Sequence, residues 1–259
     1  MRIIGWNIRA GGGRRIEAIA DQLARWRPDV VALSEFRGTP PSVWLAEELA
    51  AQGLAFQRTT ADPKAPAVNA LLVAARWPVR LRPAGAAPSE PRRWLLAGVA
   101  APQRIAVGVM HVPNRVSVHK GDYLASALDV ARRWRGGPAL LIGDTNSGRI
   151  GIDEEAPAFD RLEDGWIQDL DRAGWVDAYR TLHGDRRSYT WYSPNGDNGF
   201  RLDQAFIHRS LHSQLEGARY VWGTPSGEQH PRREALTDHA ALIVDFLPED
   251  EQFTRTVAS

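Results

Sequence analysis

The stretch LLIGDTNSG, residues 140–148, is an aliphatic run that breaks directly into Gly-Asp-Thr-Asn-Ser-Gly. Its apolar half predicts a buried strand, and its polar half consists of residues that favour turns and helix caps. Taken alone, the stretch fits two interpretations equally well. It is either an ordinary turn or a strand end that delivers Asp144 and Asn146 to a functional site. The rest of the chain has to decide between them.

Strands alternate with helices on the N-terminal side of this stretch. Residues 2–8 and 29–36 read as strands, and apolar residues at helical spacing over 14–26 predict a helix between them. Residues 117–135 form the clearest amphipathic helix, with a serine as its expected cap. Further helices are expected near 41–52 and 159–173, and further strands near 54–60, 68–75, 94–100, 104–111, 189–192, 202–208, 215–222 and 236–247.

This order of elements indicates a single α/β domain with mixed sheets, spanning residues 1–247. Residues 80–93, rich in Pro, Ala and Arg, read as a long surface loop. Residues 248–259 read as a polar C-terminal tail that frays from the domain. We expect no internal repeat.

Composition limits the class of protein. With 259 residues, of which 43% are hydrophobic, the chain can bury a large core, and its net charge of +1 argues against purely electrostatic binding of nucleic acid. The absence of cysteine excludes disulfides and thiolate metal sites. No apolar run approaches the about 18 residues of a membrane span. We therefore expect a cytoplasmic monomer without a membrane partner, although a signal peptide removed beforehand would leave secretion open.

Polar side chains recur where the expected strands begin or end. Each has an ordinary explanation on its own, such as a turn former, a paired surface acid or a satisfied core histidine. Together they suggest a site, because α/β folds bind ligands at strand ends and an unpaired buried polar group is costly. The residues are Asn7, Glu35, His111, Asp144, Asn146, Asp203, Asp238 and His239.

The chemistry of this set favours a hard cation. Carboxylate and amide oxygens suit Mg²⁺, with Mn²⁺ as a substitute, better than Zn²⁺. The chain has no HExxH motif, so a zinc hydrolase is a poor interpretation. Residues 11–13, Gly-Gly-Gly, lack the GKS or GKT ending of a P-loop, which makes nucleotide binding of that kind improbable.

Seven segments, read in order, resemble the endonuclease/exonuclease/phosphatase superfamily. They are WNI (6–8), RPDVVALSEF (27–36), MHVPN (110–114), LLIGDTNS (140–147), GWVDAYRTLH (174–183), SYTWYSPNGDNGFRLDQAFIH (188–208) and LTDHAAL (236–242). The GDxN and (S/T)DH motifs mark the superfamily at large, whereas the run VDAYR, YTWY and FRLDQ in the fifth and sixth segments looks more like the exonuclease III and abasic-endonuclease branch than the lipid or inositol phosphatases. The resemblance implies a four-layered α/β sandwich of two packed mixed sheets flanked by helices, with Mg²⁺-dependent phosphoester hydrolysis.

The resemblance also implies a role for each matching residue. Glu35 would be the principal metal carboxylate, with Asn7 and Asp238 beside it. Asp144 would position and deprotonate the attacking water, while Asp203 orients His239 to stabilise the transition state. Because Asp144 and His239 would form one coupled network, either is open as the general base. The remaining expected contacts are Asn146 to water or phosphate, His111 in catalysis, and Asn114, Phe200 and Arg201 to substrate.

The chain also departs from the branch it resembles. His111 stands where the abasic endonucleases have Tyr, Asn69 stands where Gly is common, and Gln204 follows Asp203 where an aromatic is common. A histidine at this strand end is more typical of the phosphatase and deoxyribonuclease-I-like branches. These departures leave the metal chemistry intact and put abasic-site specificity in question.

Three functions are therefore open. The leading hypothesis is a Mg²⁺-dependent nuclease acting on DNA, which Arg92-Arg93, Arg132-Arg133-Arg135 or Arg232-Arg233 would help to bind unless these patches are simply solvated. The alternative is a phosphatase or phosphodiesterase acting on a small or lipid-linked phosphate. A non-catalytic binding module is disfavoured because every expected polar position is filled.

Overall fold

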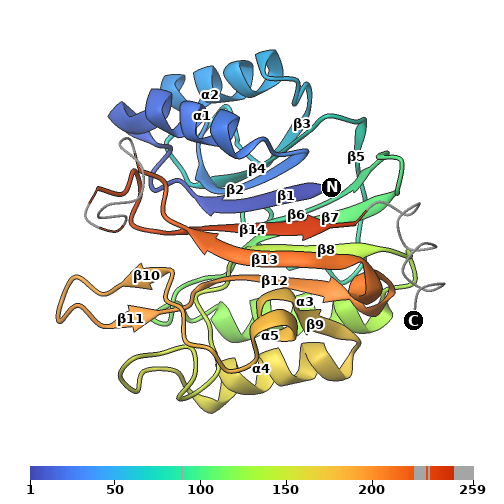
Figure 1. The fold of residues 1–259 in the computed structure, drawn as a ribbon, viewed down its shortest axis with the longest axis vertical. Coiled ribbons are helices and arrows are strands. Elements are labelled where there is room, and N and C mark those ends of the chain that lie inside the picture. Colours follow the sequence, from blue (N-terminus) through green and yellow to red (C-terminus); the bar gives the residue numbers. More distant parts are fainter. Residues whose placement is uncertain (89, 225–231, 233, 248–259) are drawn as a thin grey trace.

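The computed structural model describes residues 1–88, 90–224, 232 and 234–247 (Figure 1). Two sequence predictions fall outside these residues. They are the C-terminal tail at 248–259 and Arg233 of the Arg232-Arg233 patch.

Two six-stranded sheets form the centre of the molecule (Figure 1). The first has the order β13 (Leu215–Val221), β14 (Ala241–Phe246), β1 (Arg2–Asn7), β2 (Val30–Phe36), β4 (Ala70–Ala75), β3 (Phe56–Thr59). The second has the order β5 (Val79–Leu81), β6 (Trp94–Val99), β7 (Ile105–His111), β8 (Ala139–Asp144), β12 (Asp203–His208), β9 (Trp175–Asp177). A small ribbon pairs β10 (Trp191–Tyr192) with β11 (Gly199–Phe200).

Both sheets are mixed, as predicted. In the first, β1 and β2 are parallel, and in the second β7 and β8 are parallel, while the other pairings are antiparallel. The two parallel pairs pack on each other across the interface between the sheets. The polar ends of β1, β2, β7 and β8 therefore lie at one edge of the sandwich.

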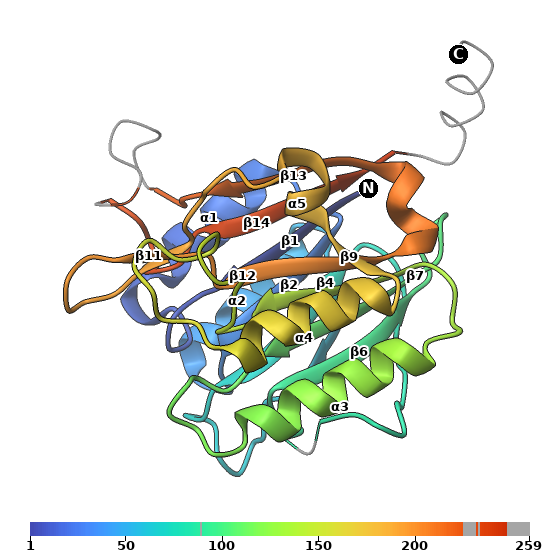
Figure 2. The same ribbon diagram turned by 90° about the horizontal axis from the view of Figure 1, so that it is seen from below.

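Helices cover the outer faces of both sheets. The helices α1 (Ile16–Trp26) and α2 (Pro40–Ala51) lie over the first sheet, and α3 (Lys120–Arg133) and α4 (Arg161–Arg172) lie over the second (Figures 1 and 2). A short helix, α5 (Ala178–His183), packs on β9, β12 and β13. Two 3-10 helices span Gly13–Arg15 and Arg209–Gln214. This is the four-layered α/β sandwich that the family resemblance implied.

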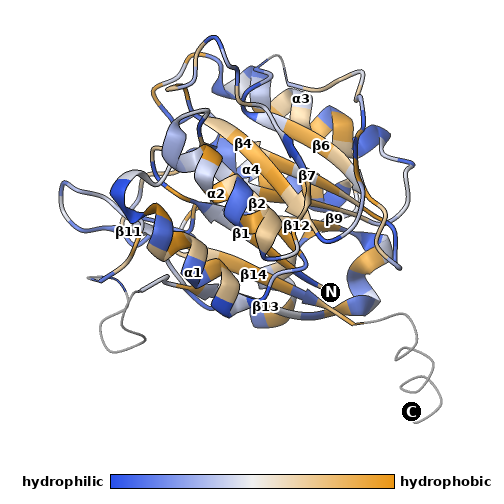
Figure 3. Ribbon diagram, turned by 90° about the horizontal axis from the view of Figure 1, so that it is seen from above, coloured by the Kyte–Doolittle hydropathy of each residue, from blue (hydrophilic) through white to orange (hydrophobic). Residues whose placement is uncertain are grey.

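Three apolar layers hold these elements together. Ile3 and Val107 belong to the layer between the sheets, Leu33 to the layer under α1 and α2, and Leu124 with Phe206 to the layer under α3 and α4. Figure 3 shows the same division, with apolar strands inside and hydrophilic residues on the outer helix faces. Within the described part of the chain, we find no helix with the length and apolar character needed to cross a bilayer.

The structure corrects several boundaries. The helix expected from 117 begins at Lys120, with His119 at the cap position and no side-chain cap, so Ser117 does not cap it. The strand expected from 236 begins only at Ala241. The expected loop at 80–93 starts with the end of β5, and β9 and α5 were not expected as separate elements. These boundaries and short elements depend on tertiary contacts, which the spacing of apolar residues in the sequence does not reveal.

One glycine fixes how closely β7 and β8 approach at the site. Gly143 pairs with Met110 and has a φ of 147°, and a Cβ atom built there would lie 1.9 Å from the Met110 carbonyl oxygen. Any side chain at position 143 would therefore push apart the two strands that end in His111 and Asp144.

We expect Gly143→Ala to lower the free energy of unfolding by about 3 kcal/mol or more, because backbone has to move to admit the methyl group. Chemical denaturation measures the change. Gly165→Ala is the matched control, since Gly165 lies in α4 with no atom within 4 Å of its Cβ position. This substitution should stabilise the protein by about 0.5–1 kcal/mol. Equal midpoints for the two variants would contradict the steric argument.

Candidate active site

Asp144 lies at the centre of a polar cluster at the edge of the sandwich. It ends β8 and is only 2% exposed. Its Oδ1 accepts a hydrogen bond from the Asn146 backbone N–H (3.0 Å), and its Oδ2 accepts one from Asn7 Nδ2 (2.9 Å). Because Asn7 ends β1 in the other sheet, the second bond connects the two sheets through their strand ends.

Two histidines face the same carboxylate. The Nε2 atoms of His111 and His239 lie 3.7 Å and 3.9 Å from Asp144 Oδ2. Burial raises the pKa of Asp144, although the nearby histidines act in the opposite direction. Burial likewise lowers the pKa of His111. A carboxylate with a raised pKa is a stronger base, and this suits Asp144 for accepting a proton from water.

His239 is held as an imidazolium. Its Nδ1 donates to Asp203 Oδ2 at 2.8 Å, and its carbonyl accepts from the indole of Trp6 and the hydroxyl of Thr237. Burial opposes the charge, but the carboxylates of Asp203 and Asp144 outweigh it and raise the pKa of His239 to about 10. At neutral pH both ring nitrogens therefore carry protons, and the Nε2 proton is not used in the pair with Asp203.

Glu35 reaches the cluster through a break in its strand. The register of β2 against β4 shifts between Ser34 and Phe36, and Glu35 has a left-handed φ of 56°. A bulge of this kind redirects a side chain at a sheet rim. Glu35 Oε2 accepts from the Ala10 backbone N–H (2.7 Å), and Oε1 lies 3.4 Å from Asn7 Nδ2. Burial opposes ionisation, yet these donors and His111 lower the pKa of Glu35.

The oxygen atoms of this cluster fit a hard cation with few protein ligands. Among the described residues, no three His, Asp or Glu side chains are grouped as a metal cage. Mg²⁺ does not require one, because it is commonly held by one or two carboxylates together with water and substrate phosphate. Asp238 Oδ1 is buried and has no hydrogen-bond partner within the described chain, while Oδ2 pairs with Arg9 Nε at 3.6 Å. A buried oxygen without a partner is chemically suited to a cation. Glu35, Asn7 and Asp238 are therefore a chemically suitable donor set.

Three other predicted residues lie around this centre. Asn146 has a left-handed φ of 44° and donates its side-chain amide to the Val112 carbonyl (2.9 Å). Asn114 is exposed in the turn after β7, where its carbonyl accepts from Ser117 N–H. Phe200 is half-buried and packs on Trp191, whose ring centroid lies 6.4 Å from that of His239. Phe200 is thus separated from His239 by one aromatic ring.

Arg201 does not lie where substrate binding requires it. The side chain is fully buried, and its guanidinium donates to Asp153 (2.7 and 2.9 Å), to Asp177 (2.7 Å) and to the Tyr220 hydroxyl (3.1 Å). The Tyr220 hydroxyl in turn donates to the Asp203 carbonyl at 2.8 Å. The prediction that Arg201 contacts substrate is therefore wrong, and the residue instead supports the strand start that carries Asp203.

Sequence patterns missed three residues that shape the site. Lys120 is buried, and its ammonium donates to the Asn146 carbonyl (2.5 Å) and pairs with Glu163. Trp191 covers the His239 ring, and Thr237 Oγ1 accepts from the His239 backbone N–H (3.1 Å). Thr237 and Trp191 lie inside the quoted TDH and YTWY segments, so their positions were visible in the sequence. Nothing in the sequence marked Lys120, because it lies at the start of an amphipathic helix.

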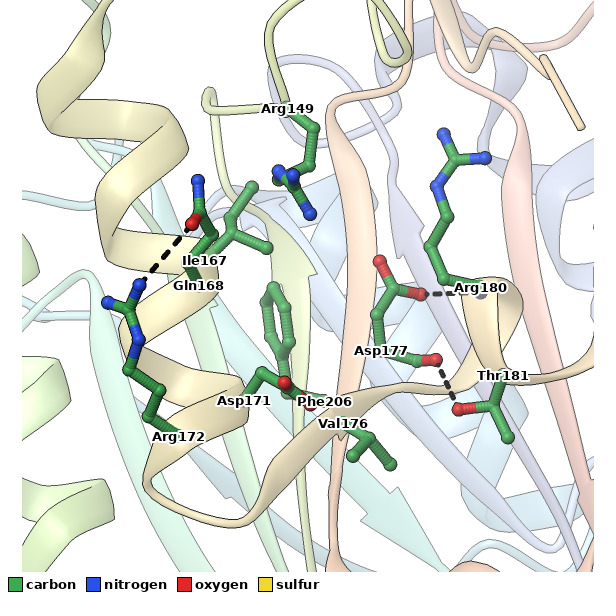
Figure 4. A pocket seen from close by; sticks show the side chains of 10 residues that line it. All are labelled: Arg149, Ile167, Gln168, Asp171, Arg172, Val176, Asp177, Arg180, Thr181 and Phe206. Atoms are coloured by element: carbon green, nitrogen blue, oxygen red, sulfur yellow. Dashed lines mark hydrogen bonds between the residues drawn. The ribbon is translucent and has the colours of Figure 1, made fainter. Parts of the chain in front are cut away.

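A separate hollow of about 450 Å³ lies between α4, β9 and α5 (Figure 4). Most of its polar groups already have partners, either in the lining or next to it. Arg172 donates to Gln168, Asp177 accepts from the Arg180 backbone N–H, and Thr181 donates to the Asp177 carbonyl. Arg149 is paired with Asp164. None of the predicted site residues lines this hollow.

A buried carboxylate, an imidazole oriented by a second carboxylate, and adjacent oxygen atoms form an arrangement that suits phosphoester hydrolysis. Comparison with family models agrees. The model described as "Endonuclease/Exonuclease/phosphatase family" matches residues 4–239. The chain therefore belongs to the endonuclease/exonuclease/phosphatase family. A comparison with curated protein sequences gives no match.

Several solved structures share the fold. A 3′ phosphatase NExo variant from Neisseria, bound to product DNA hairpin, is 22% identical with a TM-score of 0.75, covering 95% of this chain and 99% of that one. The 3′-5′ exonuclease NExo from Neisseria meningitidis is 22% identical with a TM-score of 0.74 (96% and 100% covered). An AP endonuclease from Archaeoglobus fulgidus is 19% identical with a TM-score of 0.76 (95% and 99% covered).

We expect Asp203→Asn to lower the pKa of His239 well below about 10, because burial would no longer be opposed by the paired carboxylate. NMR titration of the imidazole in metal-free wild type and variant measures this. Since the folded pKa lies above the ordinary 6.5, the pair stabilises the fold most below that pH. The contribution is lost as the pH rises toward 10, and a variant that titrates like wild type would exclude the pairing.

Arg201→Ala should lower the free energy of unfolding by about 3–5 kcal/mol, because it leaves the buried Asp153 and Asp177 carboxylates without their shared cation. Urea denaturation provides the measurement. Arg172→Ala, which removes an exposed pair with Asp169, serves as the control and should cost less than about 1 kcal/mol. A native-like midpoint for Arg201→Ala, with loss of substrate affinity alone, would restore the substrate-binding interpretation.

Proposed function

We propose that this protein is a Mg²⁺-dependent phosphodiester hydrolase that acts as a nuclease on DNA, with Mn²⁺ as a substitute metal. The observation that carries the proposal is the convergence of Glu35 and Asn7 from one sheet with Asp144 from the other, beside the His239–Asp203 pair. Phosphoryl transfer requires positioned charge more than covalent chemistry, and this cluster supplies charge of both signs.

Each residue of the cluster has a distinct task in the proposal. Glu35, Asn7 and Asp238 would hold the cation, which when bound polarises a phosphoryl oxygen and neutralises developing charge. Asp144 orients a water molecule and accepts its proton, as its raised pKa permits. His239, charged and fixed by Asp203, donates a hydrogen bond to the phosphate oxygen that gains negative charge.

A DNA substrate is supported by the DNA-processing proteins that share the fold and by the aromatic pair at the rim. In our proposal Phe200 and Trp191 provide a stacking surface beside His239, because an aromatic face can pack on any base. Asn114, exposed beyond β7, would contact a phosphate of the strand. A monomeric state remains a prediction.

A second candidate is a phosphatase that removes a terminal phosphate from the same kind of strand. His111 is compatible with it, because an imidazole at this strand end is typical of the phosphatase as well as the deoxyribonuclease-I-like branches. In this structure the ring lies 3.7 Å from Asp144 Oδ2. The structural relative NExo is described both as a 3′ phosphatase and as a 3′-5′ exonuclease. The two activities can use the same charged cluster and differ in whether the phosphorus that water attacks belongs to a terminal monoester or to a diester.

We expect Glu35→Ala and Asp144→Asn each to keep the fold and to lower turnover at least about a hundredfold, and EDTA to abolish wild-type activity. The assay offers plasmid DNA, an abasic duplex, single-stranded RNA, a 3′-phosphorylated oligonucleotide and a generic phosphomonoester with Mg²⁺ or Mn²⁺. Circular dichroism checks folding. Activity that survives chelation, or near wild-type turnover in either variant, would refute the metal mechanism. Cleavage of the phosphomonoesters alone would favour the second candidate.

A further inference from the structure

A basic hollow lies on the Glu35 and His111 side of the cluster. It has a volume of about 490 Å³, and its charged lining consists of Arg37, Arg92, Arg93 and one acid, Glu90, with Asn69 beside them. The lining therefore holds three guanidinium groups and one carboxylate. Such an excess of positive charge in a concave site attracts anions.

The hollow adjoins the catalytic cluster through two short connections. Arg37 follows Glu35 by two residues, so their Cα atoms lie within about 7.6 Å of each other. Arg93 and His111 are linked by backbone and side chain, with His111 N–H donating to the Arg93 carbonyl (3.0 Å) and Arg93 Nη1 donating to the His111 carbonyl (3.3 Å). The hollow is therefore close enough to Glu35 and His111 for a phosphate adjacent to the hydrolysed one to reach it.

Asn69 gives this hollow its specific form. Its Oδ1 accepts from Arg37 Nε at 2.7 Å, which fixes the plane of the guanidinium and leaves both Nη groups without a partner among the described residues. Gly38 N–H donates to the Pro66 carbonyl (2.9 Å) and so attaches the Asn69 loop to the Arg37 segment. Asn69 is one of the positions at which this chain departs from the family pattern described above, because Gly is common there.

The other arginine patches offer less to an anion. On α3, Arg132 and Arg133 are paired with Asp169 and Asp129, and Arg232 is paired with Asp197. Arg135, just beyond α3, donates to the Arg132 and Trp134 carbonyls instead of lining a hollow with other arginines. In the basic hollow, Arg93 is paired with Glu90 (3.0 Å) and Arg92 with Asp62 (2.8 Å), while Arg37 has only the neutral Asn69 as its partner. Arg37 thus carries a charge that no described carboxylate balances.

We propose that this hollow binds a second phosphate of the nucleic-acid strand, next to the one that is hydrolysed, with Arg37 oriented by Asn69 as the main contact. The inference rests on the proposed function and narrows its substrate class to strands with at least two phosphates. A planar guanidinium held through Nε presents two Nη donors to phosphate oxygens, the geometry in which arginine binds phosphate best. The second phosphate is either an internal diester or a terminal monoester.

The test compares wild type with Arg37→Gln, Asn69→Gly and the control Arg133→Gln, which removes one exposed charge from α3. The substrates are a thymidine p-nitrophenyl phosphodiester with one phosphate, TpT, TpTpT and pTpT. Arg37→Gln should lower kcat/KM about tenfold more on TpTpT than on the one-phosphate diester. Asn69→Gly, which keeps the charge and loses its orientation, should show a smaller effect in the same direction. A defect on pTpT but not on TpTpT would assign the hollow to a terminal phosphate.

A binding measurement separates failure of this inference from failure of the proposed function. Fluorescence anisotropy of a labelled single-stranded oligonucleotide in EDTA, at several salt concentrations, does not depend on turnover. Arg37→Gln should reduce the slope of log affinity against log salt by about 0.7, the value for one lost contact to a single strand. If wild type cleaves no oligonucleotide but this slope still falls, the nuclease proposal fails and the phosphate site stands. If Arg37→Gln behaves like Arg133→Gln in both experiments, the phosphate site is refuted.

Discussion

The hydrogen bond from Asn7 to Asp144 is the contact on which the site depends, because it joins the two sheets at their polar edge. The His239–Asp203 pair crosses the same interface, with His239 in the segment before β14 and Asp203 at the start of β12. Both bonds are short and buried, so they require the sheets to hold one relative position. The apolar layer between the sheets supplies this constraint, and close contacts such as that of Gly5 with Ile142 set its spacing.

Burial and neighbouring charge together decide the protonation of the groups at this interface. Asp203 and Asp144 keep His239 protonated against the cost of burial, whereas burial raises the pKa of Asp144 against the effect of the two nearby histidines. Both shifts favour the protonated form, so His239 stays charged as a hydrogen-bond donor while Asp144 becomes a stronger base, and environments that tune neighbouring groups in this way assign acid and base roles at one pH. Deeper in the interior, the Arg201 guanidinium balances the carboxylates of Asp153 and Asp177. Through the Tyr220 hydroxyl it also supports the start of the strand that carries Asp203.

Much of the fold followed from the sequence because its long strands and helices have strong apolar patterns, as in 29–36 and 104–111. The strand-end residues were also identifiable, since polar groups beside buried strands are rare. What escaped prediction depends on three-dimensional contacts. The bulge that turns Glu35 toward the site, the buried ammonium of Lys120 and the interior position of Arg201 leave no periodic signal. Arg201 was misassigned because proximity to Asp203 in sequence does not reveal which way a side chain points.

The strand order of the two sheets has a consequence for how such a site is assembled. In each sheet, a strand–helix–strand unit forms the parallel pair, β1–α1–β2 in one and β7–α3–β8 in the other, and antiparallel strands flank it on both sides. The units end in corresponding positions, Asn7 with Glu35 and His111 with Asp144. Each unit thus contributes a half-site of one neutral polar group and one carboxylate. Neither half is complete, and the smallest fragment of this chain that retains the chemistry must contain both.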